Sequence, residues 1–138
     1  VKGGEILDRE HGSRLGPILS IMERQIGRYG GLELQANADA GCGADSEAGV
    51  YYAFADRVIG LAAFRLAYLL GARVMWGELT SSLALMEALE RGVTLKCGRL
   101  VPAIMNRSGD DLCPMERMAS QAARDLDFYN RLMELSRR

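Results

Sequence analysis

The second half of the chain alternates short apolar runs with stretches of helical periodicity, and this alternation limits the fold more than any other feature. The short, mainly apolar run ARVMW at residues 72–76 is typical of a buried strand, and VTLKC at residues 93–97 is expected to form the next strand. Helical spacing predicts helices over residues 50–70, 80–91 and 114–137. Strands that alternate with helices usually pair in parallel. We therefore expect an α/β fold with three α/β/α layers, in which helices cover both faces of the sheet.

The predicted helices differ in how clearly their ends are marked. The helix over residues 50–70 is apolar on most sides, so we expect it to lie buried between layers and to end at Gly71. Gly60 falls inside this helix, where a glycine suggests close approach to a neighbouring element. The next helix has a Thr or Ser cap at its start and Gly92 at its end. A further short strand is expected around Pro102.

The first fifty residues give weaker signals. A short strand is expected within residues 3–10 and a helix over residues 18–26. An N-terminal strand that pairs antiparallel would make the sheet mixed. Residues 37–49 are small, polar and rich in glycine, which predicts a mobile surface loop or, alternatively, a lid over a site. We expect one domain over residues 1–138, with an N-terminal segment missing before Val1.

Charge and cysteine content exclude several classes of protein. The net charge of −1 argues against a broad surface for nucleic acid or acidic membranes. The sequence has no apolar run long enough to span a bilayer. Three cysteines without metal-type spacing fit a reduced, cytoplasmic protein better than a disulfide scaffold. The only histidine, His11, cannot build a multi-histidine metal site. We expect no metal and no cofactor.

The segment 106–116, NRSGDDLCPME, is the most unusual in the chain. Pro114 suits the first position of a helix, which makes Cys113 the N-cap and places Glu116 where it could complete a capping box. A thiol at the positive end of a helix is a candidate functional group, although the nearby Asp110, Asp111 and Glu116 oppose the effect of the helix end. Cys113 is therefore either a structural cap or a functional thiol, and both readings stay open. Cys113, Glu116 and Asp56 are the candidate catalytic residues.

Polar residues at other element ends could complete a site. Asp56 and Arg57 stand where the apolar helix is expected to begin, and Ser81 stands at the start of the next predicted helix. Asn106 and Arg107 leave a predicted strand at the end where α/β proteins bind ligands. Each has a structural alternative, such as an ion pair between Arg107 and Asp110 or Asp111. Convergence of these groups in one pocket would indicate an anion site.

Three segments in order, ADRVIGLAA, SSLAL and NRSGDDLCPME, resemble the family catalogued as domain of unknown function 1893. The matching positions are Asp56, Gly60, Ala62, Ala63, Ser81, Ala84, Asn106, Arg107, Cys113, Pro114, Met115 and Glu116. The resemblance implies a cytidine-deaminase-like fold with a mixed sheet between helices. It does not imply deamination, because the chain lacks the His/Cys-x-Glu and P-C-x-x-C ligand set that holds catalytic zinc.

These observations leave three functional readings. The first is a zinc-free protein that binds or modifies a small anionic or nucleotide-like ligand through Asp56, Arg57, Ser81, Asn106 and Arg107. The alternative is a non-catalytic regulatory or interaction domain that kept the fold, and the third is a zinc-dependent deaminase. A homo-oligomer is left open. Motif side chains that converge on one cleft would favour the first reading, and scattered side chains would favour the second.

Overall fold

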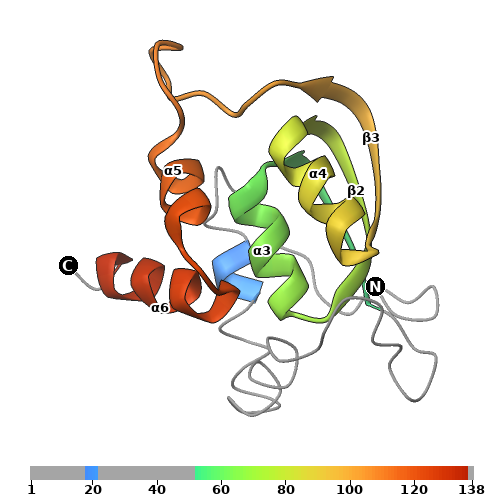
Figure 1. The fold of residues 1–138 in the computed structure, drawn as a ribbon, viewed down its shortest axis with the longest axis horizontal. Coiled ribbons are helices and arrows are strands. Elements are labelled where there is room, and N and C mark those ends of the chain that lie inside the picture. The colour runs from blue at the N-terminus through green and yellow to red at the C-terminus, as the bar shows by residue number, and fades with distance from the viewer. Residues whose placement is uncertain (1–17, 22–51, 137–138) are drawn as a thin grey trace.

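The computed structural model describes residues 18–21 and 52–136, and these form a three-stranded parallel sheet with helices packed against it (Figure 1). The strands lie in the order β1-β2-β3. In chain order the elements are β1 (Tyr52–Ile59), α3 (Leu61–Leu69), β2 (Ala72–Ser81), α4 (Ser82–Arg91), β3 (Thr94–Val101), α5 (Pro114–Gln121) and α6 (Asp125–Ser136). The predicted α/β class and parallel sheet are therefore confirmed for this part of the chain.

The strand register brings the carboxyl ends of all three strands to one edge of the sheet. Ile59 at the end of β1 pairs with Thr80, and Ser81 at the end of β2 pairs with Val101. Helices α3 and α4 begin directly after β1 and β2, so their N-termini start from this same edge.

Helix α3 forms the centre of the core. All nine of its residues are buried. It packs against β1 and β2 on one side and against α4, α5 and α6 on the others, so that α5 and α6 lie outside it (Figure 1). The prediction of a buried helix between layers holds for this segment.

The predicted residues at both ends of α4 are confirmed. Ser81 is the N-cap, and its hydroxyl accepts a hydrogen bond from the backbone N–H of Ala84 at 3.2 Å. Gly92 ends the helix in the left-handed conformation, with a φ of 69°. Strand β2 contains the whole predicted run 72–76, and β3 contains residues 94–97 of the predicted run 93–97; both strands extend beyond these runs at their carboxyl ends.

The helix predicted over residues 50–70 is wrong in its first half. Residues 52–59 form β1, and the helix begins only after Gly60. The segment is rich in Tyr, Phe, Val and Ile, which favour strands. The helical spacing across Gly60 was a coincidence of two neighbouring apolar elements. Asp56 and Arg57 consequently lie within a strand and not at a helix start.

The single helix predicted over residues 114–137 is also wrong. The chain bends at residues 122–124 and divides into α5 and α6. The cause is Arg65 of α3, whose Nη1 donates hydrogen bonds to the carbonyl oxygens of Ala119 and Ala122 at the end of α5. Because the Arg65 guanidinium donates hydrogen bonds to these carbonyl oxygens, they do not need N–H partners in a following helical turn, and the helix can end there.

Several smaller predictions are wrong, or concern residues that the structure does not describe. No separate strand forms around Pro102, since β3 ends at Val101 and only an isolated bridge between Met105 and Leu112 follows. Of the helix predicted over 18–26, residues 18–21 are described and are helical. The strand within 3–10 and the loop 37–49 fall outside the described residues, and the residues that the structure describes do not show the predicted three-layer arrangement. In the described ranges, no helix combines the length and apolarity that crossing a membrane requires.

Candidate functional site

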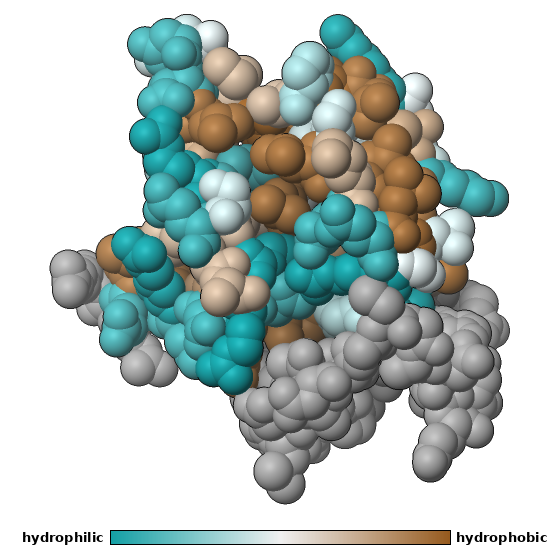
Figure 2. All heavy atoms as spheres, in the orientation of Figure 1, coloured by the Kyte–Doolittle hydropathy of each residue, from teal (hydrophilic) through white to brown (hydrophobic). Residues whose placement is uncertain are grey.

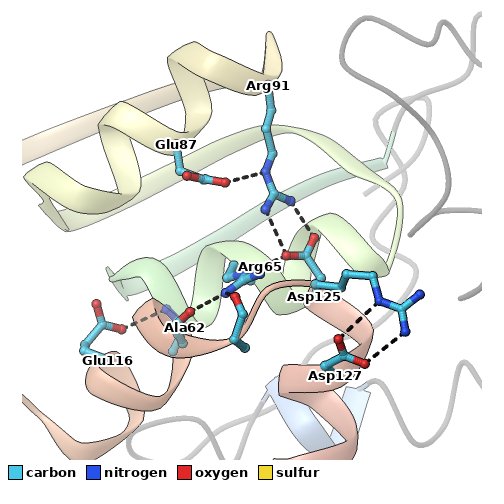
Figure 3. A network of polar contacts seen from close by, with 10 residues as sticks. Ala62, Arg65, Glu87, Arg91, Glu116, Asp125 and Asp127 are labelled. Carbon is cyan, nitrogen blue, oxygen red and sulfur yellow. Dashed lines mark hydrogen bonds and ion pairs between the residues drawn. The ribbon is translucent and has the colours of Figure 1, made fainter.

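Glu116 joins the start of α5 to the start of α3. Its side chain is 4% exposed. One carboxylate oxygen accepts the backbone N–H of Leu61 at 2.7 Å and the other accepts that of Ala62 at 2.8 Å, as Figure 3 shows for Ala62. These are N–H groups of the first turn of α3, which have no partner within their own helix. The carboxylate also faces the positive end of the helix dipole, so the contact fixes the two helices to each other.

The capping box predicted for Glu116 is therefore wrong. The backbone N–H of Cys113, which the box would have satisfied, donates instead to the carbonyl oxygen of Ile104 at 3.0 Å. Glu116 caps a different helix, which lies 55 residues earlier in the chain. A spacing rule that works within one helix could not indicate this partner.

Gly60 makes room for the Glu116 carboxylate. A Cβ atom at position 60 would lie 2.5 Å from Oε1 and 2.6 Å from Cδ of Glu116, far inside contact distance. The backbone at Gly60 is extended, with a φ of −92°, so glycine is needed here for space. The expected close approach at Gly60 is confirmed, although it occurs at a helix N-cap and not within a helix.

Gly60→Ala is expected to lower the free energy of unfolding by about 2 kcal/mol, since the new methyl group displaces Glu116 and leaves two buried N–H groups unpaired. Chemical denaturation of the variant measures this loss. In a Glu116→Ala background the same substitution should cost much less, because the colliding carboxylate is gone. Equal costs in the two backgrounds would contradict the proposed collision.

Burial raises the pKa of the Glu116 carboxyl above its usual value of 4.5, and the hydrogen bonds from Ala62 and Leu61 offset only part of this effect. A group whose pKa is raised on folding binds more protons in the folded state. Its contribution to stability is then fully present below about pH 4.5 and is lost as the pH rises through the raised pKa. Glu116 is thus a buried acid whose charged state carries a cost at neutral pH.

The non-titrating variant Glu116→Gln isolates this effect. We expect the difference in unfolding free energy, parent minus variant, to become smaller as the pH rises from 4.5 toward 7. Denaturant titrations of both proteins across this range measure it. A difference that stays constant or grows with pH would show that burial does not dominate at this carboxyl.

Cys113 is the N-cap of α5, and Pro114 is its first residue, as predicted, but the thiol makes no capping hydrogen bond. The side chain is half-buried and is not oxidised to a disulfide. Its backbone carries the local structure, because its carbonyl oxygen accepts the N–H of Arg117 at 3.0 Å. The alternative of a functional thiol stays a prediction.

The loop before α5 is a compact turn organised by Asn106. Its Oδ1 accepts the backbone N–H groups of Gly109 at 2.9 Å and Asp110 at 3.3 Å, and its Nδ2 donates to Asp110 Oδ1 at 2.9 Å. Gly109 adopts the left-handed conformation, with a φ of 74°. Asp111 forms an ion pair with Arg117 of α5. Asn106 thus has a structural role, while Arg107 lies exposed on the turn.

The remaining candidates lie on or beside the sheet. Asp56 is half-buried in β1, and burial raises the pKa of its carboxyl despite hydrogen bonds from the Arg57 and Val58 backbone. Arg57 is exposed in the same strand. Ser81 is completely buried and caps α4, and the hydroxyl of the neighbouring Thr80 is buried with no hydrogen-bond partner in the described residues.

Figure 3 shows a second polar cluster, which sequence reasoning missed. Arg65 of α3 and Arg91 of α4 both point at Asp125 of α6. Arg65 Nε lies 2.6 Å from Asp125 Oδ1, and Arg91 Nη2 lies 2.9 Å from the same oxygen. Arg91 Nε also donates to Glu87 at 2.8 Å. The available signal was Arg65 itself, a charge inside the most apolar stretch of the sequence, because buried charges are normally paired.

The structure brings together only some of the predicted residues. Glu116 and the start of α3 meet, and Cys113 and Ser81 stand at helix starts. Asp56 and Arg57 are set back within β1, and Asn106 and Arg107 lie on the turn before α5. The groups that do meet are joined by hydrogen bonds that hold elements together.

Two comparisons with known proteins agree. Among curated proteins, none matches the sequence. The crystal structure of a DUF1893 family protein, TM1506 from Thermotoga maritima, is similar with a TM-score of 0.60 and 17% sequence identity, over 89% of this chain and 69% of that one. At this identity the likeness concerns the fold alone. The family model of TM1506, described as domain of unknown function DUF1893, matches residues 50–135, and the chain therefore belongs to this family.

Proposed function

We propose that this chain is a zinc-free domain of deaminase-like fold that acts through an interaction surface and performs no chemistry of its own. The fold part of this proposal is supported by the order β1-α3-β2-α4-β3 in a parallel sheet, with helix starts at one sheet edge. The finer assignment of a three-layer, cytidine-deaminase-like sandwich extends this core to residues outside the described ranges.

The donor set at the two helix starts does not fit zinc. A zinc deaminase needs a His or Cys with a Glu two residues later at one site, and P-C-x-x-C at the other. Here α3 opens with Gly60, Leu61 and Ala62, and α4 opens with Ser81 and Ser82. Among the described residues, no cluster of His, Cys, Asp and Glu could hold a metal ion. We derive no step through zinc for this chain.

The motif side chains support a structural role. Both oxygens of Glu116 are used to cap α3, Ser81 caps α4, and Asn106 holds the turn before α5. A catalytic acid, base or nucleophile needs an atom that can reach a substrate. These three side chains instead stabilise the fold, as the interaction-domain reading expects.

The observation that carries the proposal is an inverted burial pattern on α4. The buried residues of this helix are the small Ala84 and Ala88. Three of its larger apolar side chains are exposed: Leu83 at 37%, Met86 at 58% and Leu89 at 73%, while Leu85 is half-buried. We call these three residues the α4 stripe. A surface helix normally buries its large apolar residues. Apolar side chains gather over α4 and the adjoining strand in Figure 2, and exposed patches of this kind mark interaction sites.

Site-specific photo-cross-linking tests this proposal. A photoreactive phenylalanine derivative replaces Met86 in cells that express the chain, and the same group replaces Ser120, an exposed polar residue of α5, as control. We expect a discrete cross-linked species at position 86 and none at position 120. Failure to form any discrete adduct at position 86 would overturn the proposal.

Small-ligand binding is a second candidate, and Asp56 is the observation in its favour. Its carboxyl is half-buried, burial raises its pKa, and its Oδ1 accepts a hydrogen bond from the adjacent backbone N–H of Arg57 at 2.6 Å. Perturbed carboxyls often mark functional sites. A thermal-shift screen with nucleosides, nucleotides and ADP-ribose-like compounds tests it. A concentration-dependent rise in Tm that Asp56→Asn abolishes would favour this candidate over an interaction domain.

A further inference from the structure

We propose that the α4 stripe is the contact surface between two copies of this chain, related by a two-fold axis that passes close to Met86. This inference rests on the proposed function, since it names the partner of the same surface. The stripe contains no charged residue, so it suits an apolar partner surface like itself.

The spacing of the stripe is self-complementary. Leu83 and Leu89 each lie three residues from Met86, so the sequence L-x-x-M-x-x-L reads the same in both directions. A two-fold interface requires one patch to match its own rotated copy. In an antiparallel pair of α4 helices, Met86 lies against Met86 of the partner subunit, and Leu83 lies against Leu89 of the partner subunit.

The charges at the ends of α4 agree with the antiparallel arrangement. The first turn of α4 contains no acidic residue, so the positive end of its dipole has no acidic side chain from its own turn. Glu90 is exposed near the other end of the helix. Rotation about Met86 places Glu90 beside the first turn of the partner's α4, where a carboxylate is favourable. A parallel pair would place like helix ends together.

The size of the surface predicts a reversible dimer. A helix of 10 residues is about 15 Å long, which is too short to bury the roughly 800 Å² per partner of a stable interface. Leu100 of β3 is 49% exposed, and the hydrogen bond from Ser82 Oγ to the Val101 carbonyl at 3.3 Å places this part of β3 beside the start of α4. The exposed Leu100 thus lies next to Val101 in the chain, close to the Leu83 end of the stripe, and adds apolar surface near it.

Sedimentation velocity on the purified full chain tests the inference, at concentrations from about 1 μM to about 1 mM. We expect a monomer–dimer equilibrium whose dissociation constant rises about 30-fold or more in Met86→Glu, because truncation or charging of a central interface residue has effects of this size. The matched control, Ser120→Glu, places the same charge on α5 and should leave the equilibrium unchanged. Circular dichroism checks that both variants are folded.

The outcomes separate this inference from the proposed function. A parent chain that stays monomeric over the whole range, or a dimer that Met86→Glu leaves intact, would overturn the two-fold contact. If the parent is monomeric and the cross-link at position 86 has a discrete mass other than twice that of the chain, the stripe binds a different protein and the proposed function stands. A monomer without any cross-link would remove both.

Discussion

Asp125→Ala is expected to lower the free energy of unfolding by about 4 kcal/mol, since removal of one member of a buried ion network leaves the others uncompensated. Asp125 is 6% exposed and receives hydrogen bonds from two arginines on two other helices. Arg65 is itself 5% exposed, so without Asp125 its charge would remain in the core and only backbone carbonyls would face it. The guanidinium of Arg91 lies 4.7 Å from the ring centre of Tyr68, a contact that also depends on this arrangement.

Chemical denaturation with a two-state fit measures the loss. Asp127→Ala is the matched control, because Asp127 lies two residues further along α6 and pairs with Arg124 at the surface. Exposed pairs of this kind contribute little, so the control should unfold at the same denaturant concentration as the parent. A similar loss in both variants would mean that the carboxylate at position 125 acts through the helix terminus and not through the two arginines.

Glu116→Ala is expected to lower the free energy of unfolding by about 3 kcal/mol, because two buried backbone N–H groups of α3 lose their acceptors. The loss also releases α5 from α3, so amide hydrogen exchange should accelerate at Leu61 and Ala62 before it does in β2. Glu134→Ala on the exposed side of α6 is the control and should behave like the parent. Unchanged exchange at Leu61 and Ala62 would show that water can replace the carboxylate.

Both effects concern residues whose importance the sequence could only partly indicate. The ends of α4 were predictable, because Ser81 and Gly92 are local signals whose partners lie within a few residues. The strands β2 and β3 were predictable for a similar reason, since the short stretches that form them are bounded by glycines, Gly71 and Gly77 for 72–76 and Gly92 and Gly98 for 93–97. These elements follow rules that act over one or two turns of chain.

The failures share a different cause. Residues 52–59 were assigned to a helix because apolar residues on both sides of Gly60 fit one helical spacing, and only the contact with Glu116 explains why that glycine marks a boundary. Glu116 was assigned to its own helix, whereas its acceptor atoms serve α3. In both cases the deciding partner lies more than 50 residues away, beyond the reach of any local pattern.

The contact between Arg65 and the end of α5 has a consequence for how the chain reaches its native state. The bend at residues 122–124 depends on a guanidinium supplied by α3, so a peptide of residues 114–136 alone lacks the group that holds its two halves at an angle. We therefore expect the corner to become fixed only once α3 has docked against it. Helices α5 and α6 thus take their relative orientation from a residue that was synthesised long before them.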